Sequence, residues 1–339
     1  MTQTQQVSVP VAVPEPVPSL RSQIRRRMRS SPWLPALLTS VVLVIIGQIL
    51  SPGFSSWGNI NQLLGAAAIL AIASTGQSLV MISGDFGIDL SVGQVMSLTA
   101  IGGYMVMAGG SAYLLPAVLV VLLIGGALGA LSGSLVAWIK LPALVVTLGT
   151  LVVAQGLVSV LASNGTPAGS VPPLLNSLTT DSILGVKYVT VLAVVFVGSA
   201  SLLAARTRFG RMLYLVGSNR EAARLGGLPV KRIVVLVYVI AGMCSGFAGL
   251  LLLSYAGQAN LDLGSGYLLL TLAATVIGGT SLAGGEGSVV GAATGAIAFI
   301  VVNSLMQALG LSDATRQMIV GLVLLLLLAF NARTPRLRL

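Results

Sequence analysis

The chain has 339 residues, of which 55% are hydrophobic and only 8% are charged, and its formal net charge is +10. This composition excludes an ordinary soluble globular protein and indicates an all-α membrane protein with many spans. Because its basic residues lie at the ends of apolar runs, membrane topology explains the charge better than nucleic-acid binding does, and we expect no nucleic-acid partner.

Three absences narrow the chemistry further. The sequence contains no histidine, the usual general base and the commonest metal ligand, which disfavours hydrolytic or metal chemistry. A single cysteine, Cys244, excludes an intrachain disulfide and a cysteine metal cluster. No lysine follows a glycine, so the chain has no phosphate-binding P-loop. We therefore predict no catalytic residues, no metal site and no cofactor in this chain.

The amino-terminal segment, residues 1–30, is polar and proline-rich and ends in a cluster of arginines. We expect it to be a disordered basic tail in the cytoplasm. The apolar run that follows, 33–50, is about long enough to cross a bilayer, and no A-x-A-like cleavage site comes after it. It is therefore predicted to be a retained first span rather than a signal peptide.

Nine further apolar runs predict a transmembrane region over residues 31–332 with about ten helices and both termini in the cytoplasm. In this arrangement only Lys187 and Arg316 among the basic residues lie outside, as the positive-inside rule requires, and residues 333–339 form a cytoplasmic tail. The nine runs are approximately 60–82, 91–109, 113–139, 141–163, 187–205, 233–254, 265–282, 286–309 and 313–330.

Two breaks between spans carry acidic residues. Ser83–Gln94 (SGDFGIDLSVGQ) contains Asp85 and Asp89, and Gly278–Ser288 (GGTSLAGGEGS) contains Glu286. A carboxylate so close to hydrocarbon usually caps a helix, faces a cavity or pairs with a basic group. For Asp89 an N-cap of the next span is one interpretation and a place on the solute path is another. Both breaks combine glycines with an acidic residue between adjacent spans, a pattern that hints at an internal duplication.

Polar amides inside or near the spans are further candidates for a solute path. Such side chains hydrogen-bond a polyhydroxylated solute or, as the default, bridge neighbouring helices. The residues that we consider as candidates for lining the translocation path are Asp85, Asp89, Gln77, Gln258 and Asn303.

The most highly charged stretch is the loop 206–232, which carries seven basic residues and is predicted to be cytoplasmic. Within it, Ser218 or Asn219 is a possible N-cap for a short helix over Arg220–Leu225, and Gly226, Gly227 and Pro229 would stop that helix. The residues alone leave two interpretations open. The short helix docks into a cleft of a partner, or it is a solvated loop that faces lipid headgroups.

Five stretches in order along the chain give it a resemblance to a known family. From about residue 40 to 330 the sequence resembles the membrane permease of ribose-type sugar ABC importers. The stretches are GIDLSVGQVMSLTA (87–100), LVVTLGTLVVAQGL (144–157), SNGTPAG (163–169), TRFGRMLYLVGSNREAARLGGLPV (207–230) and IGGTSLAGGEGSVVGAATGA (277–296).

The resemblance implies a function and a set of partners. The chain would be a permease in the bacterial inner membrane, with a second permease, copy or relative, completing the core. A cytoplasmic ATPase with two fused nucleotide-binding halves would bind ATP and Mg, and a periplasmic sugar-binding protein would deliver a monosaccharide or similar polar solute. One departure is SGDFGIDLS, where the family commonly has SGGIDLS, so Asp85 is additional.

The resemblance also implies particular contacts. Within the loop, Glu221, Ala222, Ala223 and Gly227 match the family's EAA segment, whose short helix docks into the ATPase. The stretch SNGTPAG falls on the outer face, where it is expected to contact the binding protein through Asn164, Gly165 and Thr166. The residues implied to couple the chain to the ATPase are Ser218, Asn219, Arg220, Glu221, Ala222, Ala223, Arg224 and Gly227.

The main rival from another class is an ion-coupled secondary transporter of a small polar solute. Such a protein needs ionisable or carbonyl ligands near the middle of the membrane. Nearly every acid of this chain lies at the end of a span, which disfavours that function. A membrane enzyme is disfavoured more strongly, because no nucleophile with a neighbouring base is recognisable.

Overall fold

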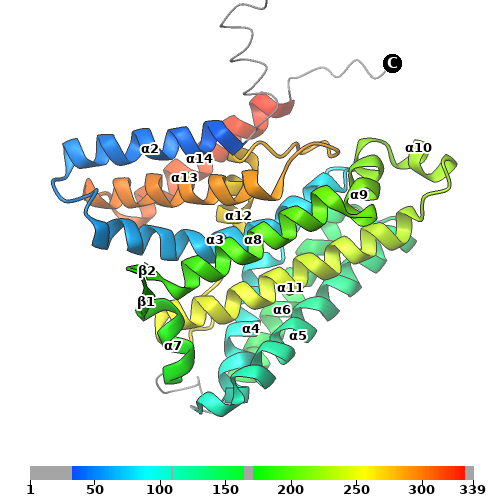
Figure 1. The fold of residues 1–339 in the computed structure, drawn as a ribbon. Helices are drawn as coiled ribbons and strands as arrows, with labels where there is room; N and C mark the ends of the chain where they lie inside the picture. The colour runs from blue at the N-terminus through cyan, green and yellow to red at the C-terminus, as the bar shows by residue number, and fades with distance from the viewer. Residues whose placement is uncertain (1–32, 108–109, 164–170, 333–339) are drawn as a thin grey trace, which may run out of the picture. The chain divides into compact units, whose positions relative to one another are not determined.

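A computed structural model describes residues 33–107, 110–163 and 171–332, and these residues are mostly helical (Figure 1). Their strands are limited to one small antiparallel hairpin of β1 (Ser182–Ile183) and β2 (Val186–Lys187), with the short helix α7 (Pro173–Thr180) before it. The prediction of an all-α membrane protein is therefore confirmed.

Each predicted apolar run contains a helix. Seven helical stretches of the described chain are both long and apolar enough to cross a membrane. The number of crossings stays a prediction, because α4 and α12 are shorter than the roughly 20 residues that a span needs. The side of the membrane on which each terminus lies also stays a prediction. The helices are α2 (Trp33–Leu50), α3 (Trp57–Ile82), α4 (Val92–Met107), α5 (Leu114–Ser134), α6 (Ala143–Ala162), α8 (Tyr188–Arg206), α11 (Val230–Ala256), α12 (Tyr267–Ile277), α13 (Val289–Ala308) and α14 (Asp313–Ala332).

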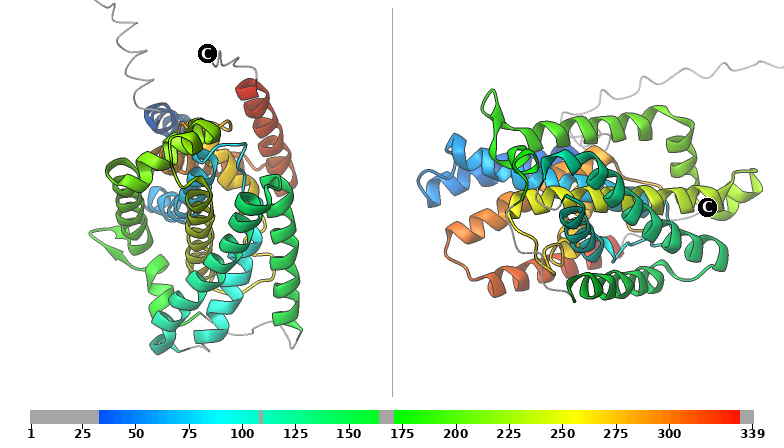
Figure 2. Two further views of the ribbon diagram at one scale, coloured as in Figure 1. Left: turned by 90° about the vertical axis from the view of Figure 1, so that its right-hand side faces the viewer. Right: turned by 90° about the horizontal axis from the view of Figure 1, so that it is seen from below.

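Helix α11 runs through the middle of the other helices and packs most closely against α5 (Figures 1 and 2). Glycines make this close packing possible. A Cβ at Gly125 would lie 2.1 Å from the carbonyl oxygen of Gly242, and a Cβ at Gly242 would lie 2.0 Å from the carbonyl oxygen of Gly125. Small residues are what allow helix backbones to approach so closely in a membrane.

Helix α12 is short because Gly278 and Gly279 end it, with φ of 84° at Gly279, and because the chain before it is not helical and folds back beside the start of α4. The amide of Gly264 donates a hydrogen bond of 2.9 Å to Ser97 Oγ, and a Cβ at Gly264 would lie 2.3 Å from the carbonyl oxygen of Gly93. The predicted run 265–282 is thus helical only over Tyr267–Ile277. Non-helical backbone at this depth is tolerated where it is buried in protein or lines a cavity.

Candidate functional site

The predicted cytoplasmic loop contains two helices, α9 (Arg208–Ser218) and α10 (Arg220–Leu225), between α8 and α11 (Figure 1). The sequence predicted α10 but not α9. Helix α9 is capped at its start by Thr207, whose hydroxyl accepts a hydrogen bond of 3.2 Å from the amide of Gly210. Its side chains Leu213 and Val216 are fully buried in a cluster that includes residues of α3 and α11. Helix α9 therefore fixes the base of the loop on the membrane-spanning helices.

Helix α10 begins and ends as predicted. Of the two possible N-caps, Asn219 is used, because its Oδ1 accepts hydrogen bonds from the amides of Glu221 (3.1 Å) and Ala222 (3.0 Å). The hydroxyl of Ser218 instead donates to the carbonyl oxygen of Tyr214. At the other end the chain turns at Gly227, whose φ of 79° lies in the left-handed region that glycine adopts at no steric cost.

The outer surface of α10 is charged, and its underside is apolar. Glu221 and Arg224 form an exposed ion pair, with Arg224 Nε donating to Glu221 Oε2 at 3.1 Å. This hydrogen bond holds the pKa of the Glu221 carboxyl below its usual value. Leu225 is exposed, whereas Ala223 is buried against the helices beneath. The helix therefore presents one face outward while the other is fixed to the bundle.

Arg220 joins α10 to the break between α3 and α4. Its Nη1 donates to Asp85 Oδ2 at 3.0 Å, its Nη2 donates to the carbonyl oxygen of Gly84 at 3.2 Å, and both Nε and Nη2 donate to that of Ser83 at 3.4 Å. Burial lowers the pKa of the Arg220 guanidinium, and the charge of Asp85 opposes that shift. Of the roles considered for Asp85, the structure shows the pair with a basic group.

The two acidic breaks and the end of α9 meet at a set of glycines that we call the glycine junction: Gly84, Gly217, Gly284 and Gly285. The amide of Gly285 donates a 3.0 Å hydrogen bond to the carbonyl oxygen of Ile82. A Cβ at Gly217 would lie 1.8 Å from that oxygen, and one at Gly284 would lie 2.1 Å from the Cα of Gly84. The junction thus brings the ends of α3 and α9 into direct contact with the break between α12 and α13.

A charged groove of about 670 Å³ opens beside α10. One of its walls is formed by Lys231, whose Nζ lies 4.8 Å from the ring centroid of Trp138. Because basic side chains outnumber acidic ones around the groove, it suits a protein surface that carries acidic groups. The charged residues that line it are Asp85, Lys140, Arg220, Glu221, Arg224 and Lys231.

The remaining path candidates lie on separate elements. Asp89 is buried in a turn before α4, where its Oδ1 accepts hydrogen bonds from the amide (2.9 Å) and hydroxyl (2.6 Å) of Ser91. It therefore bonds the residue that precedes α4 rather than an amide inside the helix. Gln77 is buried in α3, and its side-chain amide has no hydrogen-bond partner within the described residues. Gln258 is exposed after the end of α11, and Asn303 in α13 accepts from Arg316.

The structure does not join the five path candidates into one site, since no hydrogen bond connects any two of them in the described part of the chain. The predicted contacts of the binding protein, Asn164, Gly165 and Thr166, lie outside the described residues.

Comparison with known proteins decides the family. A model of the family described as the permease component of branched-chain amino acid transport systems matches residues 59–328. The chain belongs to this family of permeases. It is 34% identical over 309 residues to the ribose import permease protein RbsC of Escherichia coli (strain K12), covering 89% of this chain and 95% of that protein. No solved structure matches the chain.

A second relative is the autoinducer 2 import system permease protein LsrC of Shigella flexneri, which is 33% identical over 301 residues, covering 88% of this chain and 86% of the relative. Family membership confirms that this permease is a transport subunit and not an enzyme. Together with the long apolar helices, it also confirms the prediction of a multi-pass protein of the inner membrane.

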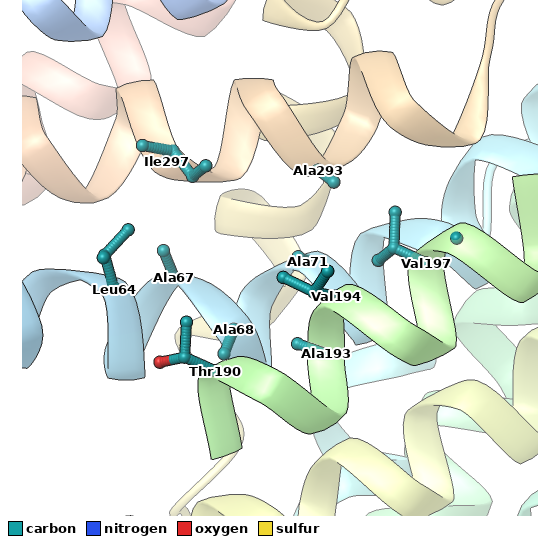
Figure 3. A pocket seen from close by; sticks show the side chains of 11 residues that line it. Leu64, Ala67, Ala68, Ala71, Thr190, Ala193, Val194, Val197, Ala293 and Ile297 are labelled. Carbon is teal, nitrogen blue, oxygen red and sulfur yellow. The ribbon is translucent and has the colours of Figure 1, made fainter. Parts of the chain in front are cut away.

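The permease also has an apolar crevice of about 270 Å³ between α3, α8 and α13. Figure 3 shows that its walls are aliphatic apart from the hydroxyl of Thr190. A polar solute would lose its hydrogen bonds to water there without gaining replacements, at a cost of several kcal/mol, roughly 2–7 per group. This crevice is therefore unsuited to a polar solute.

Proposed function

We propose that this permease forms the translocation path of an ATP-binding-cassette importer for a monosaccharide or a similar polar solute. The relatives that are about one-third identical over most of both chains carry names of import permeases for ribose and for autoinducer 2, and these names support the solute class. The observation that carries the mechanism concerns α10. One face of this helix is exposed on the surface of the bundle, and its first residue, Arg220, is bonded to the break between α3 and α4.

The proposal requires three partners. A cytoplasmic ATPase with two fused nucleotide-binding halves binds ATP and Mg and receives α10 in a cleft. The exposed Glu221–Arg224 pair and the charged groove beside it support this docking surface. A periplasmic sugar-binding protein delivers the solute, and a second permease, either another copy or a related chain, completes the core.

The contacts around α10 supply a mechanical route from the ATPase to the spans. When the ATPase halves close on ATP, they displace α10, which moves α11 directly because only a short turn ending at Pro229 separates the two helices. Arg220 carries the same displacement to the end of α3, and the glycine junction carries it to the start of α13. Such rigid-body shifts of packed helices are a common means of alternating access.

Two variants of α10 test the proposal. Glu221→Arg replaces the exposed acid by a base, and Gly227→Leu places a side chain where φ is 79°. We expect both variants to insert into the membrane but to lose copurification with the ATPase and ATP-driven uptake of labelled monosaccharides. Leu184→Ala, on the exposed turn of the β1–β2 hairpin, is the matched control and should retain both.

Normal uptake by Glu221→Arg and Gly227→Leu would overturn the docking role of α10. Uptake by the purified chain in liposomes without any ATPase, driven by a proton or sodium gradient, would replace the proposal by ion-coupled transport.

A further inference from the structure

A groove with polar side chains in a largely apolar wall lies between the start of α12, the end of α13 and the start of α14, three helices that are neighbours in Figure 1. Its volume is about 620 Å³, inside the range of roughly 300–1,000 Å³ that is typical of small-molecule sites. It differs from the apolar crevice because side chains with hydrogen-bonding groups enter it from all three sides. These polar residues are Ser265, Asn303, Asp313, Arg316 and Gln317.

One side of the groove is formed where α12 begins. The non-helical chain before α12 is bonded to the side of α4 through Gly264. Ser265 and Gly266 line the groove at this point. Irregular backbone at membrane depth commonly lines a water-filled cavity in transporters.

The charged side chains in the groove are already paired with each other, and this pairing restricts the kind of ligand that the groove can bind. Arg316 is paired with the carboxylate of Asp313, and its Nη1 donates to Asn303 Oδ1 at 2.9 Å. Since this pair is neutral as a whole, the groove offers no net charge to an ionic ligand. It does offer both hydrogen-bond donors and acceptors, in the guanidinium, amide and carboxylate groups.

A polyhydroxylated solute complements this arrangement because each hydroxyl both donates and accepts a hydrogen bond. The Nε atom of Arg316 is buried and has no partner among the described residues, so it remains available to such a hydroxyl after a small movement of the side chain. Gln317, one residue along α14, lines the same groove. Asn303 was a path candidate from the sequence, whereas Arg316 and Gln317 were not.

We propose that this groove is a binding site for a neutral polyhydroxylated solute, with Asn303 and Arg316 as the residues that contact its hydroxyls. The solute binds at this site during its passage through the permease, and this part of the inference rests on the proposed function. Binding itself requires neither the ATPase nor the binding protein, so the two ideas can be tested separately.

Protection of single cysteines from labelling tests the site in the full chain. Cys244 is buried, and Cys244→Ala provides a background without a native thiol. In this background Gln317→Cys places a thiol in the groove, whereas Ala314→Cys places one on the exposed first turn of α14 outside it. Each variant, in membranes without the ATPase, is labelled with a membrane-impermeant maleimide in the presence and absence of D-ribose at high concentration.

We expect both thiols to be labelled, and ribose to slow the labelling of Gln317→Cys by about fivefold or more while leaving Ala314→Cys unchanged. Potassium chloride at equal osmolality should change neither rate. Adding Asn303→Ala to Gln317→Cys should remove most of the protection, because a residue that contacts the solute is lost.

Three results would overturn the inference: no labelling of Gln317→Cys while Ala314→Cys reacts, equal rates with and without ribose, or equal slowing of both thiols. ATP-driven uptake by the complete transporter without ribose protection would refute the groove but not the proposed function. Protection without ATP-driven uptake would refute the proposed function but not the groove.

Discussion

The two side chains of the ion pair between Arg220 and Asp85 differ in their exposure to water. The Asp85 side chain is 73% exposed, so water screens its charge, and a pair of this kind typically contributes about 1 kcal/mol or less. The Arg220 side chain is only 23% exposed and also bonds the carbonyl oxygens of Ser83 and Gly84. At the end of α3 no further turn of helix satisfies the carbonyl of Ser83, whereas that of Gly84 also accepts a hydrogen bond of 3.1 Å from the amide of Gly87. The arginine therefore holds the break even without the acid.

From this difference we predict that Arg220→Ala impairs coupling more than Asp85→Ala does. Loss of the bonds from Arg220 should cost about 2–3 kcal/mol at this contact, and loss of Asp85 about 1 kcal/mol or less. The measurement is the rate of ATP-driven uptake in proteoliposomes that contain the complete transporter. The exchanged pair Asp85→Arg with Arg220→Asp should not recover activity, because an aspartate cannot donate to the carbonyl groups. Recovery by the exchanged pair would show that charge alone matters.

The role of Asp85 illustrates what the sequence determines at this scale. The cost of a carboxylate near hydrocarbon singled the residue out, but the choice between cap, path and ion pair depended on a partner 135 positions away. Asn219 was easier to predict, because a cap bonds amides two and three residues along the same chain. The sequence therefore predicts a contact between near neighbours, such as a helix cap, but not an ion pair between residues far apart in the chain.

Among the elements, α9 was missed although its sequence carried a signal. Phe209, Met212, Leu213 and Val216 recur with the spacing of one helix face, and the structure buries Leu213 and Val216 completely. The density of arginines in this stretch had favoured a loop. Helix α12 was overestimated because the predicted run 265–282 extended into the second break, whereas the helix ends at Ile277 and the chain turns at Gly279, whose φ is 84°.

The glycine junction gives a prediction about α9 and the two breaks that it contacts. Gly217→Ala would place a Cβ 1.8 Å from the Ile82 carbonyl oxygen, so the segments must separate. Overpacking of this kind costs about 1–3 kcal/mol. We expect a lower unfolding temperature of the purified permease and weaker stimulation of ATP hydrolysis by the loaded binding protein.

The matched control for the junction is Gly149→Ala in α6, where a Cβ would meet nothing within 4 Å. In the middle of a helix, Gly149→Ala should stabilise the folded permease by about 0.5–1 kcal/mol, whereas Gly217→Ala should destabilise it. If Gly217→Ala behaves like Gly149→Ala in both measurements, the close contacts at the junction do not constrain the permease.

For the whole molecule, the contacts between loops agree with the topology expected from charge. The breaks after α3 and α12 and the loop containing α9 were all predicted on the cytoplasmic side, and they meet at the glycine junction. On the opposite side, the indole of Trp57 and the amide of Asn61 both donate to the carbonyl oxygen of Gly185 in the β1–β2 hairpin. These contacts group the loops into two sets, whereas only the basic residues indicate which set faces the cytoplasm.

Labelling of cysteines placed at two exposed leucine positions therefore decides the orientation of the permease. In the Cys244→Ala background, Leu184→Cys lies on the hairpin and Leu225→Cys on α10, and the native side chains are 99% and 77% exposed. An impermeant maleimide should label Leu184→Cys when it has access to the periplasm only, and Leu225→Cys only after the inner membrane is opened. Translocating the arginines of the α9–α10 loop across hydrocarbon would be costly, which is the physical reason for this expectation. If Leu225→Cys were labelled from the periplasm, α10 could not meet a cytoplasmic ATPase, and the coupling route through Arg220 would have no source of energy.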